Sequence, residues 1–233
     1  MSRPAPGLLL AVALLCGGCT DRGTAMSAAE TLRRQAIELR ARNEISRAEE
    51  TLKQAVTLQG DATADQRAAT ADLLAELGAL QSSAGRTDAA EQNYREALAL
   101  ATRDQRRAEV TINLRTQLAG LCYRRTNYQE AANLYHVILQ QEEASLGTGH
   151  PDVLDTLSIL GGLELKLQHL DVAEKLFRRQ LIGVRKLHGA EKREVSSVLD
   201  NLAEVAERAG KHEDAKELRT EAARIRHKLC DEC

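Results

Sequence analysis

The last four residues of the chain are the first candidates for chemistry, because two cysteines stand there with two acids between them. Cys230 and Cys233 enclose Asp231 and Glu232. Such a pair can close a small disulfide, transfer disulfides, or supply two of the four ligands of a zinc site. The adjacent acids disfavour the thiolate on which disulfide transfer depends. We therefore expect a frayed tail or a passive disulfide at residues 230–233, and metal binding or intermolecular pairing remain the alternatives.

The other residues that could do chemistry form no catalytic pattern. No histidine belongs to an H-E-x-x-H pair or a defensible Ser-His-Asp arrangement. Gly161-Gly162 falls within a helical pattern, which excludes a phosphate-binding loop there. Cys122 has apolar neighbours, so we expect it in the core. We predict no enzymatic activity, no metal, no cofactor and no small-molecule substrate. The histidines fall mainly in expected turns and on outer helix faces: His136, His150, His169, His188, His212 and His227.

The amino terminus carries a second pair of cysteines after a short apolar run. Arg3 is its one cation, and Leu8–Leu15 is followed by Cys16-Gly-Gly-Cys19. Eight apolar residues are too few for a helix across a bilayer core of about 30 Å. This arrangement is typical of a secretory signal peptide, predicted over residues 1–18.

Gly17-Gly18-Cys19 resembles a bacterial lipobox, although Cys16 stands where that motif usually has Leu. The resemblance implies cleavage before Cys19, lipidation of that residue, and a tether over residues 19–26. Thr20 after the cysteine favours the outer membrane, on its periplasmic side, over the inner one. An ordinary secretory signal, giving a periplasmic protein, and a retained anchor are the alternatives.

Composition predicts an all-α fold for the rest of the chain. Ala, Leu, Glu, Arg and Gln are abundant, aromatic residues make up 2%, and two of the three prolines are Pro4 and Pro6. These residue types lose little on entering a helix. The net charge of −2 lacks the basic footprint of a nucleic-acid-binding protein.

The chain repeats with a period of about 42 residues, which is the signature of an α-solenoid. Leu-small pairs precede four of the five repeated alanines by 13 and 12 positions, and an aromatic residue follows three of them by four. Small residues are expected where two antiparallel helices approach most closely. The alanines that define the period are Ala48, Ala90, Ala131, Ala173 and Ala215.

This pattern resembles the tetratricopeptide repeat, and Leu146–Val153, with its Gly-x-x-His-Pro-x-Val phrase, resembles the kinesin-light-chain type. Ala97 and Ala222 fill the final alanine slot, whereas Ile138 and Gln180 depart from it. The resemblance implies a right-handed superhelical solenoid of about five helix-turn-helix hairpins. HEAT or armadillo repeats also fit the length, but the internal helix prolines associated with HEAT are absent. The solenoid is expected over residues 27–229, with repeats at about 27–60, 64–103, 106–147, 150–189 and 192–229.

In folds of this family the first helix of each repeat lines a concave peptide-binding groove. One column within it is basic, because Arg124, Lys166 and Arg208 recur every 42 residues. These cations favour an acidic partner, or else they only stabilise the negative helix ends. The resemblance implies this candidate groove: Asn113, Thr116, Gln117, Tyr123, Arg124, Ser158, Lys166, Asn201 and Arg208.

Taken together, the signal and the repeats predict a protein- or peptide-binding adaptor or assembly scaffold, held at the membrane by lipid and facing the periplasm. The alternative is a structural subunit or assembly factor of an envelope secretion or pilus complex.

Overall fold

The computed structural model describes residues 22–104, 108–189 and 192–231, and the side chains among them from residue 28 to residue 229. Every regular element in these ranges is an α-helix. Cys19 and Cys233 lie outside the described residues, and so does the side chain of Cys230. The helices are α1 (Arg22–Ala41), α2 (Ile45–Gln59), α3 (Ala64–Ser83), α4 (Thr87–Arg103), α5 (Ala108–Arg124), α6 (Tyr128–Leu146), α7 (Pro151–Lys166), α8 (Leu170–His188), α9 (Arg193–Arg208) and α10 (His212–Asp231).

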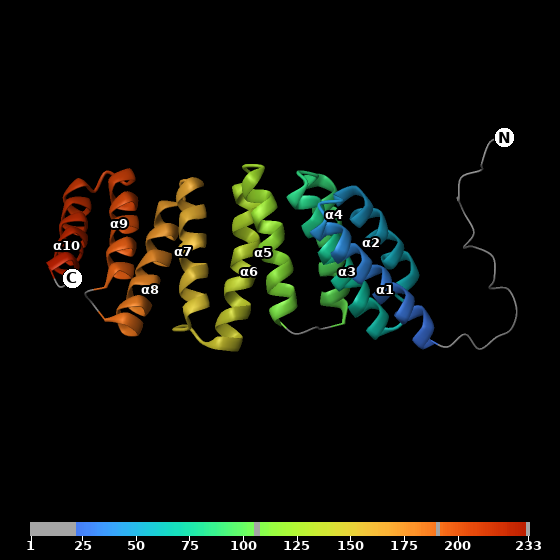
Figure 1. Ribbon diagram of the computed structural model, residues 1–233. Helices are drawn as coiled ribbons and strands as arrows, with labels where there is room; N and C mark the ends of the chain where they lie inside the picture. The colour runs from blue at the N-terminus through green and yellow to red at the C-terminus, as the bar shows by residue number, and fades with distance from the viewer. Residues whose placement is uncertain (1–21, 105–107, 190–191, 232–233) are drawn as a thin grey trace, which may run out of the picture.

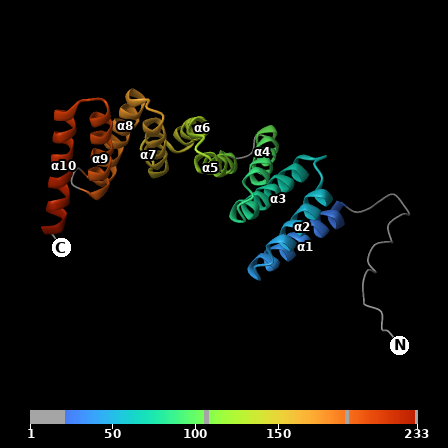
Figure 2. The ribbon, with the colours of Figure 1, turned by 90° about the horizontal axis from the view of Figure 1, so that it is seen from above.

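The helices pack in sequence order as five antiparallel hairpins, α1–α2 to α9–α10 (Figure 1). Each hairpin packs on the next through its second helix and the first helix of its neighbour. Seen from above, the hairpins follow an arch, with the odd-numbered helices towards its inner side (Figure 2). The all-α solenoid predicted from the sequence is therefore confirmed.

The ends of the helices agree closely with the pattern of the sequence. The five hairpins begin and end within two residues of the expected repeats, except that α1 begins at Arg22, inside the segment 19–26 that we expected as a tether. Pro151 is the first residue of α7, and the His150 side chain accepts a hydrogen bond from the backbone N–H of Asp152 at 3.3 Å. His150 therefore has the turn role expected of it, as the N-cap of that helix.

The turn inside each hairpin has the same backbone geometry. Its middle residue has a positive φ, between 59° and 76°. The following N–H donates to a carbonyl five residues earlier, at 2.8 to 2.9 Å. This is the Schellman arrangement, which favours glycine at the left-handed position. The five middle residues are Asn43, Gly85, Thr126, Gln168 and Gly210.

Thr126 is the most strained of these five, because a β-branched residue fits the left-handed region poorly. Relief of about 1–2 kcal/mol, partly offset by the entropy of an added glycine, should stabilise Thr126→Gly by about 0.5–1 kcal/mol. Urea denaturation measures this, and Gly85→Thr at the equivalent turn should change stability in the opposite direction. A less stable Thr126→Gly variant would refute the assignment of strain to this backbone.

The small residues of the repeat lie where the sequence predicted close helix approach. A Cβ added at Gly78 would lie 3.0 Å from the Tyr94 ring, and one added at Gly161 would lie 2.7 Å from the Phe177 ring. Both aromatic side chains are almost fully buried. In these two hairpins the aromatic residue therefore packs directly on the glycine of the paired helix.

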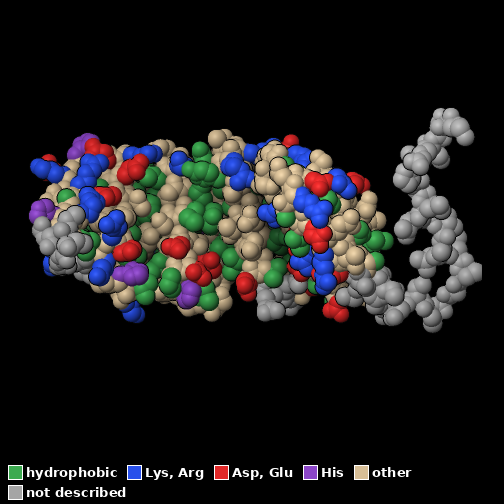
Figure 3. All heavy atoms as spheres, viewed as in Figure 1, with side chains coloured by type: hydrophobic (Ala, Val, Ile, Leu, Met, Phe, Trp, Pro, Cys, Tyr) green, Lys and Arg blue, Asp and Glu red, His purple; other side chains and the backbone are tan. Residues whose placement is uncertain are grey.

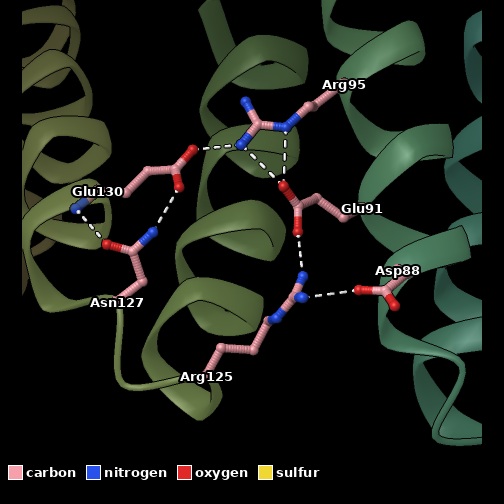
Figure 4. A network of polar contacts seen from close by, with 6 residues as sticks. All are labelled: Asp88, Glu91, Arg95, Arg125, Asn127 and Glu130. Carbon is pink, nitrogen blue, oxygen red and sulfur yellow. Dashed lines mark hydrogen bonds and ion pairs between the residues drawn. The ribbon is translucent and has the colours of Figure 1, made fainter.

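Ion pairs join neighbouring hairpins on the surface, as Figure 4 shows between α4 and the α5–α6 hairpin. Arg125 bridges Glu91, at 2.8 Å, and Asp88, also at 2.8 Å. Arg95 joins Glu91 to Glu130 and holds the pKa of Glu130 below its usual value. Because most of these side chains are partly exposed, the ion pairs add little stability. Their main effect is to fix the register between neighbouring hairpins.

Candidate functional site

Two open pockets lie side by side on the inner face of the arch. The first, of about 750 Å³, lies between α1, α3 and α5 and is named here the α3 pocket. The second, of about 490 Å³, lies between α5, α6 and α7 and is named here the acidic pocket. Glu109 and Asn113 line both. The two pockets therefore form one continuous trough across the first helices of four hairpins, α1, α3, α5 and α7.

The α3 pocket contains charges of both signs. Arg33 from α1 donates through Nε to Oε1 of Glu76 on α3 at 2.8 Å. This hydrogen bond raises the pKa of Arg33. Asp72 and Glu109 also line the pocket. Its charge is thus partly neutralised by the protein itself.

The acidic pocket differs from the α3 pocket in the charge of its lining. Its lining includes Glu109 from the first turn of α5, Glu142 from α6 and Asp152 from the first turn of α7. None of the described residues that line it is Lys, Arg or His. The remaining lining residues are Ile112, Asn113, Thr116, Gln117, Ser145 and Leu146. Figure 3 shows Asp and Glu side chains gathered over the lower half of α5, α6 and α7 on this face.

Glu142 is the most buried of the three carboxylates. It is 7% exposed, and no described group donates a hydrogen bond to its Oε2. Burial raises the pKa of Glu142, and the negative charges of Asp152 and Asp155 act in the same direction. A hydrogen bond from Thr156 and the nearby His150 oppose this rise in pKa. The pocket therefore contains a carboxylate whose charge is poorly compensated.

The raised pKa of Glu142 predicts a pH-dependent effect on stability. An acid whose folded pKa lies above its unfolded value destabilises the fold when ionised, by about 1.4 kcal/mol per pKa unit. Glu142→Gln should therefore be more stable than the wild type at pH 7. The difference should shrink as the pH falls through the folded pKa towards the ordinary value of 4.5.

Thermal unfolding of both proteins between pH 4 and pH 8 measures this difference. Glu96→Gln on α4, at an exposed position, is the control and should show no such trend. A Glu142→Gln variant that loses stability at neutral pH would contradict the uncompensated charge.

The structure separates the residues predicted for the groove into two groups. Asn113, Thr116 and Gln117 line the acidic pocket, and Asn113 also lines the α3 pocket. The others lie along α5, α7 and α9 but line neither of these pockets; they are Tyr123, Arg124, Ser158, Lys166, Asn201 and Arg208.

Each cation of the basic column contacts the preceding hairpin. Arg124 donates to the Ser82 hydroxyl at 2.7 Å, and Arg208 donates to the Leu165 carbonyl at 3.4 Å. Lys166 Nζ lies 5.7 Å from the centre of the Tyr123 ring and 5.4 Å from that of Tyr128. These contacts favour the role at the helix ends, and binding of an acidic partner by this column stays a prediction.

Sequence reasoning missed the carboxylates of the trough. Glu109 and Asp152 stand in first turns of helices, where an acid is expected for local reasons. Glu142 did carry a signal, because Leu100 and Val184 stand 42 residues before and after it. An acid at a repeat position that is apolar in the neighbouring repeats breaks the local pattern, and such breaks are expected at functional or strained sites.

The described cysteine and two of the histidines have contacts that stabilise the fold. Cys122 is buried, as predicted, and burial raises the pKa of its thiol to about 11. His136 and His169 both contact the buried carboxylate of Glu164, at 3.0 and 2.7 Å. Among the described side chains, no three His, Cys, Asp or Glu residues are grouped to hold a metal ion. Within the same ranges, no helix is both long and apolar enough to cross a membrane.

Comparison with known proteins agrees with this geometry. Residues 156–228 match the tetratricopeptide repeat family. A putative kinesin light chain with TPR-like repeats from Podosopora anserina superimposes with a TM-score of 0.68 at 18% identity, over 88% of this chain and 97% of that one. BtubC (BKLC) from P. vanneervenii gives a TM-score of 0.64 at 19% identity, over 89% of this chain and 90% of that one.

A third similar structure, that of MamA, gives a TM-score of 0.60 at 15% identity, over 90% of this chain and 96% of that one. No curated protein matches the sequence. At these identities the structural similarity concerns the fold. The described helices therefore form a solenoid of the tetratricopeptide type, and residues 156–228 match the tetratricopeptide repeat family itself.

Proposed function

We propose that this protein is a non-enzymatic binding scaffold that holds a segment of another protein in the trough on its inner face. One observation carries this proposal: the α3 pocket and the acidic pocket share Glu109 and Asn113, and so provide a continuous surface across four hairpins. An extended segment could contact side chains of successive repeats along such a trough, which matches the use of concave solenoid surfaces for binding.

Site-specific crosslinking tests this proposal. A photoreactive amino acid replaces Asn113 in the trough or, as the control, Ile182 on α8, which is 70% exposed. Peptides selected from a random twelve-residue library against the full chain should crosslink at position 113 and not at position 182. Crosslinking at position 182 alone would place binding on the outer helices and refute the proposal.

We further propose that the scaffold is anchored by lipid at Cys19 and faces the periplasm. The support is the short apolar run before Gly17-Gly18-Cys19. More than one acyl chain is needed for stable anchoring. Labelled palmitate should enter the wild type and a Cys16→Ser variant but not a Cys19→Ser variant, when the chain is expressed in bacteria. Equal labelling of the Cys19→Ser variant would exclude that residue as the lipidation site.

A further inference from the structure

The acidic pocket has a chemical preference that the fold does not dictate. We infer that it binds the basic side chain, Lys or Arg, of the protein segment held in the trough. This inference rests on the proposed function and adds the charge of the partner. A basic partner segment differs from the acidic partner that the sequence suggested through the basic column of Arg124, Lys166 and Arg208.

The charge of the lining is the first argument. Glu109, Glu142 and Asp152 come from three different helices and converge on one cavity that, among the described residues, no cation lines. By contrast, the neighbouring α3 pocket already holds Arg33 paired with Glu76. A cation supplied by a partner would do in the acidic pocket what Arg33 does in the α3 pocket. Complementary charge of this kind gives a binding site its specificity.

The second argument is independent of the acidic cluster and concerns the buried atoms of Glu142. Its side chain lines the pocket, yet Oε2 accepts no hydrogen bond from any described group. A buried acceptor without a partner is unfavourable. The terminal torsion of a glutamate is broad, so a small rotation can present either oxygen to the pocket. A guanidinium or ammonium group there would satisfy the acceptor and compensate the charge.

The surroundings of the pocket favour a protein segment as the source of this cation. The cavity is continuous with the α3 pocket through Glu109 and Asn113. Asn113, Thr116 and Gln117 add amide and hydroxyl groups that can bond a peptide backbone. Tyr123 and Ile159, 46% and 45% exposed, lie further along α5 and α7 and offer apolar contacts. A free amine or a metal ion would use the carboxylates but not these neighbouring groups.

Peptide selection with matched variants tests the inference. The full chain in detergent selects from the random twelve-residue library, and the best peptide is resynthesised with each Lys or Arg replaced by norleucine or citrulline. Fluorescence anisotropy then compares these peptides on the wild type and on the variant Glu109→Gln, Glu142→Gln, Asp152→Asn. The control variant Glu96→Gln, Glu213→Gln, Glu217→Gln removes the same charge at exposed positions of α4 and α10.

The expected result is one basic position whose replacement weakens binding to the wild type and the control by about tenfold or more. The same replacement should change binding to the pocket variant by less than about twofold. Circular dichroism melting confirms that each variant is folded. Competition by free spermidine or Mg²⁺ at the concentration of the peptide would overturn the inference in favour of a small cation.

Two further outcomes separate the inference from the proposed function. Peptides that crosslink at position 113 but lack a preferred basic residue, or that bind the pocket variant unchanged, would overturn the inference and leave the scaffold function standing. Absence of any peptide crosslinking in the trough would overturn both.

Discussion

Replacing Phe177 by Ala is expected to lower the free energy of unfolding by about 3–5 kcal/mol. The ring is 1% exposed and fills the space between α7 and α8, directly over Gly161. Because the paired position is Gly161, the residue directly under the ring has no side chain that could move into the cavity. The cost should therefore lie in the upper part of the range for large-to-small substitutions.

Urea denaturation followed by circular dichroism measures this effect. Ile182→Ala on the same helix is the matched control, because Ile182 is 70% exposed. It should change the free energy by less than about 0.5 kcal/mol. Equal effects of the two substitutions would mean that the contact between the aromatic ring and the glycine contributes nothing particular to this hairpin.

Most of the fold could be predicted because each repeat contains the same solution to one packing problem. Small residues such as Ala173 recur at fixed spacing on the paired helices. In the two hairpins that contain Tyr94 and Phe177, the ring packs on a position without Cβ, Gly78 or Gly161. The backbone conformation of the turn within each hairpin could not be predicted at every repeat. Thr126 and Gln168 adopt the left-handed conformation that Gly85 and Gly210 adopt without strain. Tertiary packing therefore overrides local preference at these two turns.

The site could be predicted only in part, because the family pattern concerns packing and not recognition. Asn113, Thr116 and Gln117, which their repeat positions place in the candidate groove, line the trough, and their role in binding stays a prediction. The pattern could not show that Arg124 and Arg208 reach back to the preceding hairpin. Nor could it show that Glu142 enters a cavity between three helices, since that depends on how neighbouring hairpins are spaced.

The two adjacent glycines of α7 give the sharpest test of this packing, because they should respond in opposite directions. A Cβ at Gly161 would lie 2.7 Å from Cε1 and 2.8 Å from Cζ of Phe177, whereas one at Gly162 would meet no atom within 4 Å. Overpacking costs about 1–3 kcal/mol, and replacing a helical glycine by alanine gains about 1 kcal/mol. Gly161→Ala should therefore lose stability and Gly162→Ala should gain it.

Urea denaturation of both variants should show a difference of about 1–3 kcal/mol between these neighbouring positions, because the gain from replacing a helical glycine is common to both. A double variant, Gly161→Ala with Phe177→Leu, separates steric conflict from other causes. If the ring is the obstacle, the smaller Leu makes room for the new methyl group, and Gly161→Ala should cost less in this background than in the wild type. If Gly161→Ala is as stabilising as Gly162→Ala, the two helices can separate without loss, and close approach at the glycine is not what holds the hairpin together.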